Sequence, residues 1–379
     1  MPRRLYPLFT KQYQHAPTYA IRSPGRVNII GEHTDYNDGF VLPMALEKET
    51  QLLISPRKDR AIELFSANLK QGVRIDFDNL IRNPKKARWS RYAAAVAWAL
   101  ETTFNQKLNG FNAVIYSTIP MGAGVSSSAS FELAVAKALS LTNELTWDPI
   151  VMAKLCQTAE NKFVGVNCGI MDQLICATAV KDHANLIDCR SLESQPVPLP
   201  NNTVIVVMDT ATRRGLATSA YNERRQQCET AAAALGVKAL RDATIDQLHA
   251  LKSQLDLLTY KRAHHVISEN SRTQQAAIAM KNHDAKQLGQ LMVDSHHSLN
   301  QDFEVTNDAL NTMVNIANQT AGCFGARMTG AGFGGCAVAL VNTEHCQQFI
   351  AEVSKQYQQI TGLKPALYSS KAMAGCGEI

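Results

Sequence analysis

Between a predicted strand and a predicted helix the chain reads Gly122-Ala123-Gly124-Val125-Ser126-Ser127-Ser128-Ala129-Ser130. Its glycines let the backbone turn tightly and approach a ligand closely. The first turn of the helix offers unpaired N–H groups and the positive end of the helix dipole, which suit a phosphate. Residues 122–128, the phosphate loop, are therefore candidates for binding a nucleotide. A serine-rich helix cap explains this stretch alone equally well, and it is neither a Walker A loop nor a dinucleotide fingerprint.

A second polar segment, the acidic loop, reads Gly31-Glu32-His33-Thr34-Asp35-Tyr36-Asn37-Asp38-Gly39. Glu32, His33 and Asp35 bring three hydrogen-bonding side chains into four positions. Sugar hydroxyls both donate and accept hydrogen bonds, while carboxylates accept them and imidazole can do either. A solvated Asx turn is the alternative, to which Asp38-Gly39 is well suited. For residues 32–35 we prefer the sugar-binding interpretation.

A third segment, the glycine-rich segment, reads Gly325-Ala326-Arg327-Met328-Thr329-Gly330-Ala331-Gly332-Phe333-Gly334-Gly335. It contains five glycines in eleven residues and lies between two predicted strands. A hairpin turn needs only one or two glycines. The excess favours a loop that closes over a nucleotide or a substrate.

Composition excludes several classes of protein. The 379 residues include 38 Lys plus Arg and 33 Asp plus Glu, and the resulting charge of +5 is spread over scattered pairs such as Arg3-Arg4. Nucleic-acid binders concentrate such charge on one stripe, so we expect no nucleic-acid partner. The nine cysteines form no C-x-x-C pair and no zinc spacing, which indicates reduced thiols. No apolar run follows the basic N-terminus, and we expect a cytoplasmic protein without a membrane segment.

Helical and strand patterns alternate irregularly along the chain. Helix spacing covers residues 91–104 and strand patterning covers 111–117, while 325–329 and 336–341 resemble a hairpin. This mixture predicts an α+β fold rather than a doubly wound parallel sheet. A polar segment with Pro196, Pro198 and Pro200 suggests a division of the chain into domains of residues 1–195 and 196–379.

The order and separation of these motifs resemble those of the GHMP family of small-molecule kinases, which is named for galactokinase, homoserine kinase, mevalonate kinase and phosphomevalonate kinase. Within that family, residues 25–36 resemble the galactokinase signature. Supporting matches run through most of the chain. They are Cys168-Gly169-Ile170-Met171-Asp172-Gln173, Tyr221-Asn222-Glu223-Arg224-Arg225, Leu240-Arg241-Asp242 and residues 328–336.

This resemblance implies a fold and a reaction. The fold is an N-terminal unit similar to domain 2 of ribosomal protein S5 and a ferredoxin-like C-terminal unit, with the active site between them. The reaction is transfer of the γ-phosphoryl group of MgATP to the C1 hydroxyl of galactose, the first committed step of galactose breakdown. ATP and Mg²⁺ are the implied cofactors, and we expect a monomer.

The resemblance also implies roles for individual residues. Arg26 and Asp172 are the expected catalytic pair, in which Asp172 either accepts the proton of the sugar hydroxyl or orients that hydroxyl. The phosphate loop and Ser66 are expected to contact the nucleotide. The expected Mg²⁺ ligands are Ser128 and Glu160. The positions implied to bind the sugar are Glu32, His33, Thr34, Asp35, Gly169 and Tyr221.

Two alternatives remain open at this point. One is a kinase of N-acetylgalactosamine or of another GHMP substrate, because the width of a sugar pocket cannot be inferred from the sequence. The other is a galactokinase-like sugar sensor without catalysis, against which the presence of Arg26, Ser128 and Asp172 argues.

Overall fold

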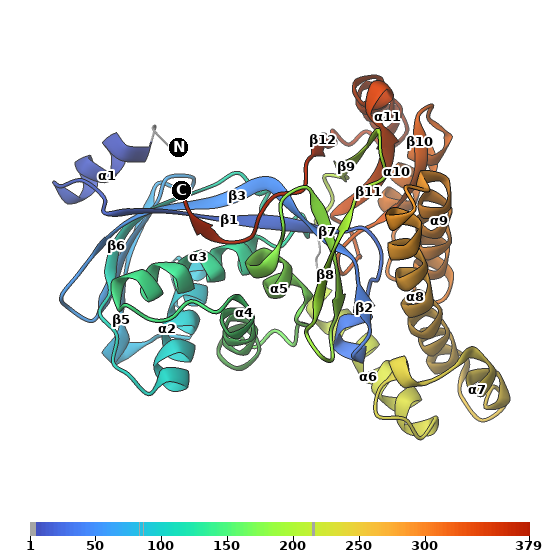
Figure 1. Ribbon diagram of the computed structural model, residues 1–379, viewed down its shortest axis with the longest axis horizontal. Helices are drawn as coiled ribbons and strands as arrows, with labels where there is room; N and C mark the ends of the chain where they lie inside the picture. Colours follow the sequence, from blue (N-terminus) through green and yellow to red (C-terminus); the bar gives the residue numbers. More distant parts are fainter. Residues whose placement is uncertain (1–4, 83, 86, 214–216) are drawn as a thin grey trace.

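The structure is a computed structural model that describes residues 5–82, 84–85, 87–213 and 217–379 (Figure 1). The pair Arg3-Arg4 lies outside these residues. The helices are α1 (Tyr6–Tyr13), α2 (Arg91–Phe104), α3 (Ser127–Thr142), α4 (Pro149–Thr158), α5 (Met171–Thr178), α6 (Ala217–Ala234), α7 (Ile245–Ala250), α8 (Leu257–Lys281), α9 (Ala285–Gln301), α10 (Asp308–Gln319) and α11 (Cys346–Thr361).

The strands form three separate sheets, and most pairs are antiparallel, which confirms the predicted α+β class. The strands are β1 (Tyr19–Asn28), β2 (Phe40–Val41), β3 (Pro43–Pro56), β4 (Ala61–Ser66), β5 (Gln71–Asp76), β6 (Phe111–Ser117), β7 (His183–Asp188), β8 (Ser194–Pro198), β9 (Thr203–Asp209), β10 (Cys323–Met328), β11 (Cys336–Asn342), β12 (Ala366–Ser370) and β13 (Gly377–Glu378).

The N-terminal sheet has the strand order β13-β1-β3-β6-β4-β5, and only β4 and β6 pair in parallel. Successive side chains of a strand point to opposite faces, so each strand contributes to two cores. Leu52 and Ile115 pack with helices α2, α3, α4 and α5 on one face. Leu53 and Val114 pack with Phe9 of α1 on the other. Helix α3 is one of the helices on the first face, and the phosphate loop ends in its first turn (Figure 1).

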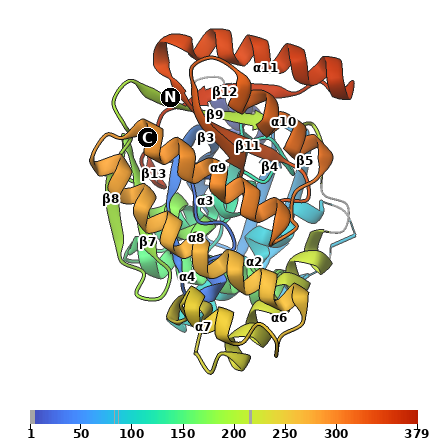
Figure 2. The same cartoon turned by 90° about the vertical axis from the view of Figure 1, so that its right-hand side faces the viewer.

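The C-terminal sheet has the strand order β10-β11-β9-β12. Val206 and Met208 of β9 pack with residues of α10 and α11, while Ile205 and Val207 face the side on which α9 packs. Figure 2 shows α8 and α9 running side by side along the molecule. Among the described residues, no helix combines the length and the apolar composition needed to cross a membrane.

One apolar cluster joins the two halves. It contains Val27 and Met44 from the N-terminal sheet together with Val207 and Val338 from the C-terminal sheet, all fully buried. Because interiors are close-packed, a shared core fixes the two sheets relative to one another. The distance between the end of β1 and the end of β10 is therefore fixed by this core.

The expected division at residues 195 and 196 falls inside β8, which pairs with β7 as an edge strand of the three-stranded sheet β2-β7-β8. Its prolines fit an edge strand, where a missing N–H does not break a ladder. The end of the chain returns to the N-terminal sheet, where β13 pairs with β1 (Figure 1). The domain division stays a prediction.

Candidate active site

A cavity of about 620 Å³ lies between the two units. Pockets of this size accommodate small-molecule ligands. Most of the site residues expected from the sequence line it. They are Arg26, Glu32, His33, Asp35, Gly122, Gly124, Ser126, Ser127, Ser128, Glu160, Gly169, Asp172 and Tyr221.

Two of the expected ligand-binding residues, Thr34 and Ser66, are not among the residues that line the cavity. Thr34 is fully buried, and its hydroxyl is within hydrogen-bonding distance of the carbonyl oxygens of Gly31 (2.9 Å) and Phe40 (2.7 Å). Its contacts hold the acidic loop in shape. The Ser66 hydroxyl accepts a hydrogen bond from the Leu69 N–H at 3.2 Å. The nucleotide contact of Ser66 and the sugar contact of Thr34 stay predictions.

The glycine-rich segment packs directly on the phosphate loop. A Cβ added to Gly335 would lie 2.7 Å from the carbonyl oxygen of Ala123, and Gly335 has a positive φ of 86°. Only glycine fits this approach without strain. Ala123 and Val125 are themselves buried and do not line the cavity, so their backbone rather than their side chains shapes the loop.

Arg26 and Asp172 form an ion pair at the floor of the cavity. The Arg26 Nε and Nη2 atoms lie 2.8 and 2.7 Å from Asp172 Oδ1. Arg26 Nη1 also donates to the carbonyl oxygen of Gly124 at 2.7 Å, which ties the pair to the phosphate loop. The Arg26 side chain is 5% exposed and the Asp172 side chain 30%, so the carboxylate is the partner that faces the cavity.

Ser126 donates a hydrogen bond of 2.5 Å to the second carboxylate oxygen of Asp172. Ser126 is also the N-cap residue of α3, with a left-handed φ of 58°, and its side chain does not cap the helix. Left-handed backbone at a non-glycine residue stores strain and clusters at functional sites. The loop therefore gives up a helix cap to orient Asp172, a role that the serine-rich pattern alone did not indicate.

Aromatic rings and a carboxylate form the other end of the cavity. The His33 ring lies 5.6 Å from that of Tyr221 and 4.6 Å from that of Phe303, centroid to centroid. Burial, followed by the charge of Asp172, raises the pKa of Asp35 to about 6. This end of the cavity therefore combines apolar ring surface with hydrogen-bond acceptors. A site that binds a pyranose needs both.

Gly169 approaches Asp35 so closely that a side chain would not fit between them. A Cβ at Gly169 would lie 1.8 Å from Asp35 Oδ2. The Cys-Gly-Ile-Met-Asp run therefore packs its glycine against the acidic loop just before α5, and presents Asp172 to the cavity from the first turn of that helix.

Glu160 lies on a π-helical segment, η5 (Ala159–Val164), that continues α4. Such segments are frequent at functional sites. Gln173 donates to Glu160 Oε2 at 2.7 Å and to Glu132 Oε2 at 3.2 Å. Burial, followed by the charge of Asp172, raises the pKa of Glu160 to about 7.

The residues around Glu160 fit the modest demands of Mg²⁺. The ion prefers oxygen ligands and keeps several waters, so one carboxylate and one hydroxyl are sufficient from the protein. Ser128 and Glu160 line the same cavity. No group of three or more His, Cys, Asp or Glu residues suited to a metal occurs in the part of the chain that the structure describes. The donor set therefore suits a cation that is shared with substrate phosphates.

Sequence reasoning missed several residues of the cavity wall. Arg213 follows β9, and its guanidinium pairs with Asp209 at 2.7 Å. A Cβ at Gly122 would lie 3.5 Å from Arg213 Cδ, so this cation lies over the phosphate loop. It belongs to none of the three motifs, and only the approach of β9 to the loop reveals it. Met121 and Val166 were missed as well. Cys168, Met171, Asn222, Gly330 and Ala331 also line the cavity, and they lie in segments that the sequence analysis had singled out without giving these residues a role.

Three family models match the chain. Residues 7–56 match the galactokinase galactose-binding signature. Residues 91–179 match the N-terminal domain of GHMP kinases, and residues 276–359 match the C-terminal domain of GHMP kinases. The first match contains Arg26 and the acidic loop, and the second contains the phosphate loop and Asp172.

Solved structures of several kinases have the same fold. A Lactococcus lactis galactokinase complexed with galactose is 33% identical, with a TM-score of 0.94 over 100% of this chain and 99% of that chain. A mevalonate kinase from Methanococcus jannaschii is 19% identical, with a TM-score of 0.67 over 93% of this chain and 98% of that chain. A homoserine kinase from Cytophaga hutchinsonii is 13% identical, with a TM-score of 0.63 over 95% and 97%. The last two resemblances concern the fold alone.

Proposed function

The chain belongs to the galactokinases of the GHMP kinase family, and from that premise we propose that its cavity binds ATP and galactose and forms galactose 1-phosphate and ADP. The γ-phosphoryl group of ATP passes to the C1 hydroxyl of the sugar. One observation carries this proposal. The Arg26–Asp172 pair lies between the phosphate loop and the acidic loop, where a phosphate and a sugar hydroxyl would meet.

Asp172 is assigned to the sugar hydroxyl. Its Oδ1 is held by Arg26 and its Oδ2 by Ser126, so the carboxylate has a fixed orientation toward the cavity. Phosphoryl transfer depends mainly on positioning and on stabilising charge, because the transition state is loose. A fixed carboxylate that accepts the hydrogen bond of the C1 hydroxyl aligns its oxygen with the phosphorus and receives its proton as the new bond forms.

The phosphate loop and Arg213 are assigned to the triphosphate. The N–H groups at the start of α3 and the positive end of its dipole favour an anion. Arg213 adds a cation at the loop's rim. Arg26 binds the Gly124 carbonyl oxygen, so the same guanidinium that orients Asp172 also fixes the loop. Displacing Arg26 would disturb both substrates.

Ser128 and Glu160 are assigned to Mg²⁺. When bound, the ion neutralises phosphate oxygens of ATP. Gln173 fixes one oxygen of Glu160 and so aims the carboxylate. Glu160→Gln is expected to raise the Mg²⁺ concentration needed for half-maximal rate by roughly tenfold or more, since one charged ligand is lost. An unchanged Mg²⁺ requirement would remove Glu160 from the assignment.

The test of the substrate is an ATP-consumption assay with galactose, N-acetylgalactosamine, glucose, mevalonate and homoserine. Galactose is expected to give the largest kcat/KM. A larger value with N-acetylgalactosamine or mevalonate would overturn the assignment, and galactose binding without any turnover would favour a sugar sensor.

The test of the mechanism is Asp172→Asn, which keeps the size of the side chain and removes its charge. We expect turnover to fall by roughly 10³-fold or more, because the general base contributes about 10²–10⁴ and the Arg26 pair is also lost. Galactose affinity, measured by calorimetry without ATP, is expected to stay within about threefold. Near-normal turnover would refute the role of Asp172.

We also propose that the protein is a monomer and that its two units divide near residue 195. Light scattering tests the first statement, and limited proteolysis within residues 191–202 tests the second. A dimer mass or resistance of that segment to cleavage would contradict them.

A further inference from the structure

Arg327 is a charged residue in a position that normally holds an apolar one. It lies on β10, where its neighbours Ala326 and Met328 face the core formed with α10. Side chains alternate along a strand, so Arg327 points to the opposite face. It is 0% exposed there. Burying a charge is costly unless the charge is paired and hydrogen-bonded, so the contacts of Arg327 call for a functional account.

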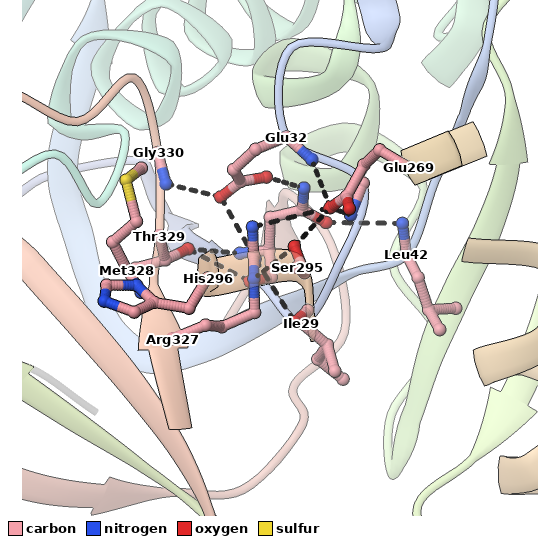
Figure 3. Close-up of polar contacts among 12 residues, drawn as sticks. Ile29, Glu32, Leu42, Glu269, Ser295, His296, Arg327, Met328, Thr329 and Gly330 are labelled. Carbon is pink, nitrogen blue, oxygen red and sulfur yellow. Dashed lines mark hydrogen bonds and ion pairs between the residues drawn. The ribbon is translucent and has the colours of Figure 1, made fainter. Parts of the chain in front are cut away.

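Part of the Arg327 guanidinium binds neutral groups. Its Nε donates to the hydroxyl of Ser295 on α9 at 3.1 Å. Its Nη1 donates to the carbonyl oxygens of Asn28 and Ile29 at 3.3 Å each. These two residues lie where β1 ends and the chain enters the acidic loop. Arg327 thus connects the C-terminal sheet to the base of that loop (Figure 3).

The rest of the guanidinium lies between two carboxylates. Arg327 Nη1 is 3.5 Å from Glu32 Oε1, and Nη2 is 3.6 Å from Glu269 Oε1. Glu32 and Glu269 are 1% and 0% exposed. Figure 3 shows the three side chains converging from β10, the acidic loop and α8. Only Glu32 of the three lines the cavity.

The hydrogen-bond partners of Glu32 are donors, which favour an ionised carboxylate. Its Oε1 accepts a hydrogen bond of 2.5 Å from the Gly330 N–H, and its Oε2 accepts one from the side-chain amide of Asn28. Arg327 is a third donor. Donors on both oxygens favour the ionised form, which accepts hydrogen bonds and donates none. It offers about four lone-pair positions, so capacity remains for a sugar hydroxyl.

Glu269 acts on the backbone beside Glu32. Its Oε1 accepts hydrogen bonds from the N–H groups of Gly31 at 3.0 Å and Glu32 at 3.3 Å, and from the Ser295 hydroxyl at 2.6 Å. Its Oε2 accepts from Arg272 at 2.8 Å. Burial acts to raise the pKa of Glu269, but the charges of Arg272 and Arg327 hold it well below its usual value. Glu269 is therefore a fixed anion that anchors the first turn of the acidic loop.

We propose that Arg327 and Glu269 are a positioning pair for the sugar site. Glu269 fixes the backbone at Gly31 and Glu32, and Arg327 keeps the Glu32 carboxylate charged and aimed into the cavity. Because Glu32 also holds the Gly330 N–H, the pair couples the sugar site to the glycine-rich segment that packs on the phosphate loop. This inference rests on the proposed function, since it assigns the Glu32 carboxylate to a galactose hydroxyl.

Charge at Glu32 depends strongly on Arg327. Burial raises the pKa of Glu32 above its usual value, and the largest opposing influence is Arg327, followed by Arg26. Removing Arg327 leaves Glu32 near the like charge of Glu269. The pKa of Glu32 then rises further. Glu32 therefore becomes protonated, and a poorer hydrogen-bond acceptor, at a higher pH than in the wild-type protein.

Other titrating groups around Glu32 need to be separated from this effect. His265 of α8 contacts the Glu32 carbonyl oxygen, and His296 of α9 contacts the Met328 N–H. Burial lowers the pKa of each histidine to about 4, so both are neutral near pH 7. Asp35 titrates in the same range as the expected effect. Asp35 still titrates in a background without the Glu32 carboxylate, so an effect of the Arg327 variant that disappears in that background comes from Glu32 and not from Asp35.

The test is Arg327→Met, which keeps much of the side-chain volume, studied by initial rates between about pH 5.5 and about pH 9. We expect the KM for galactose to rise at least tenfold at about pH 7 while the KM for ATP changes less than about twofold. The rise should be largest at low pH and should diminish as pH increases, because Glu32 is then ionised again. In an E32Q background, R327M should change neither the KM for galactose nor its pH dependence.

Two further variants keep the inference falsifiable if R327M does not fold. Glu269→Gln removes the anion that competes for Arg327, so the acid limb of the galactose KM should move to lower pH, opposite to R327M. Arg262→Met is the matched control, because Arg262 is 1% exposed and pairs with Glu304 instead of Glu32. It should leave the pH profile unchanged even if it lowers stability.

The outcomes separate the inference from the function on which it rests. A wild-type protein that does not phosphorylate galactose would overturn the proposed function, whatever the variants do. If the wild-type protein is active, a rise of the galactose KM in R327M that is equal at every pH, or that persists in the E32Q background, would overturn the positioning role. The positioning role would also be overturned if the acid limb of the galactose KM in E269Q stayed in place or moved to higher pH.

Discussion

Gly169→Ala tests the geometry of the sugar site with a single methyl group. A Cβ at this position would lie 1.8 Å from Asp35 Oδ2, 2.2 Å from Cγ and 2.7 Å from Oδ1. Such atoms do not approach within about 3 Å, so the carboxylate must move by roughly 1 Å or more. Asp35 then leaves the position from which it would accept a hydrogen bond from galactose.

The expected size of the effect follows from the lost contact. A hydrogen bond to a charged group contributes about 1.5–3 kcal/mol. Since about 1.4 kcal/mol is a factor of ten, the galactose kcat/KM should fall roughly 10- to 100-fold. The KM for ATP should change little, because the nucleotide is assigned to the phosphate loop. A coupled assay of ADP release measures both values, and thermal unfolding reports whether the fold is kept.

The control is Gly377→Ala, because a Cβ there meets nothing within 4 Å. The decisive measurement is the double-mutant cycle with Asp35→Ala. If the methyl group acts only by displacing the carboxylate, Gly169→Ala should cost almost nothing once that carboxylate is gone. Additive losses in the double variant, or an unchanged galactose KM in the single one, would refute the steric argument.

Three other predictions concern the same molecule. Burial and the charge of Asp172 raise the pKa of Asp35 to about 6, so the galactose KM should rise as pH falls through 6 and protonates this acceptor, and Asp35→Asn should remove the Asp35 part of that acid limb and leave the part that Glu32 contributes. Ser126→Ala removes the 2.5 Å hydrogen bond to Asp172, and kcat should fall roughly tenfold or more with little change in galactose affinity by calorimetry, whereas an unchanged kcat would contradict the orienting role. Phe9→Ala empties a fully buried site between α1 and the N-terminal sheet, and the free energy of unfolding in urea should drop by about 3 kcal/mol while steady-state kinetics stay normal.

The sequence determined the elements whose own pattern is complete. The helix expected over residues 91–104 and the strand expected over 111–117 match α2 and β6. In α2 the spacing of apolar residues arises from a core on one face, and in β6 a short apolar run marks a strand that is buried on both faces. Both patterns are contained in neighbouring residues. The motifs were visible for a related reason. Close backbone approach requires glycine, and a dense run of polar groups at the acidic loop has few structural explanations.

Tertiary structure decided the elements whose pattern is interrupted. Helix α9 was missed, because its buried face carries Ser295 and His296 among the apolar residues. Those polar groups are buried because they face Arg327 and the Met328 N–H on β10. Strand β8 was not predicted as a strand and was taken for a domain boundary, because its prolines are compatible with a strand only at the edge of a sheet.

The same limit applies to the site. The polar run at the acidic loop indicated Glu32, and the family resemblance added Arg26 and Asp172. It did not reveal that Ser126 binds Asp172, or that Arg327 lies between Glu32 and Glu269. These contacts join residues far apart in the chain, and whether a charge there is buried and paired depends on how the sheets and helices pack. Local pattern and the family resemblance therefore indicated candidate site residues, and only the packing of the two units decided which contacts hold them in place.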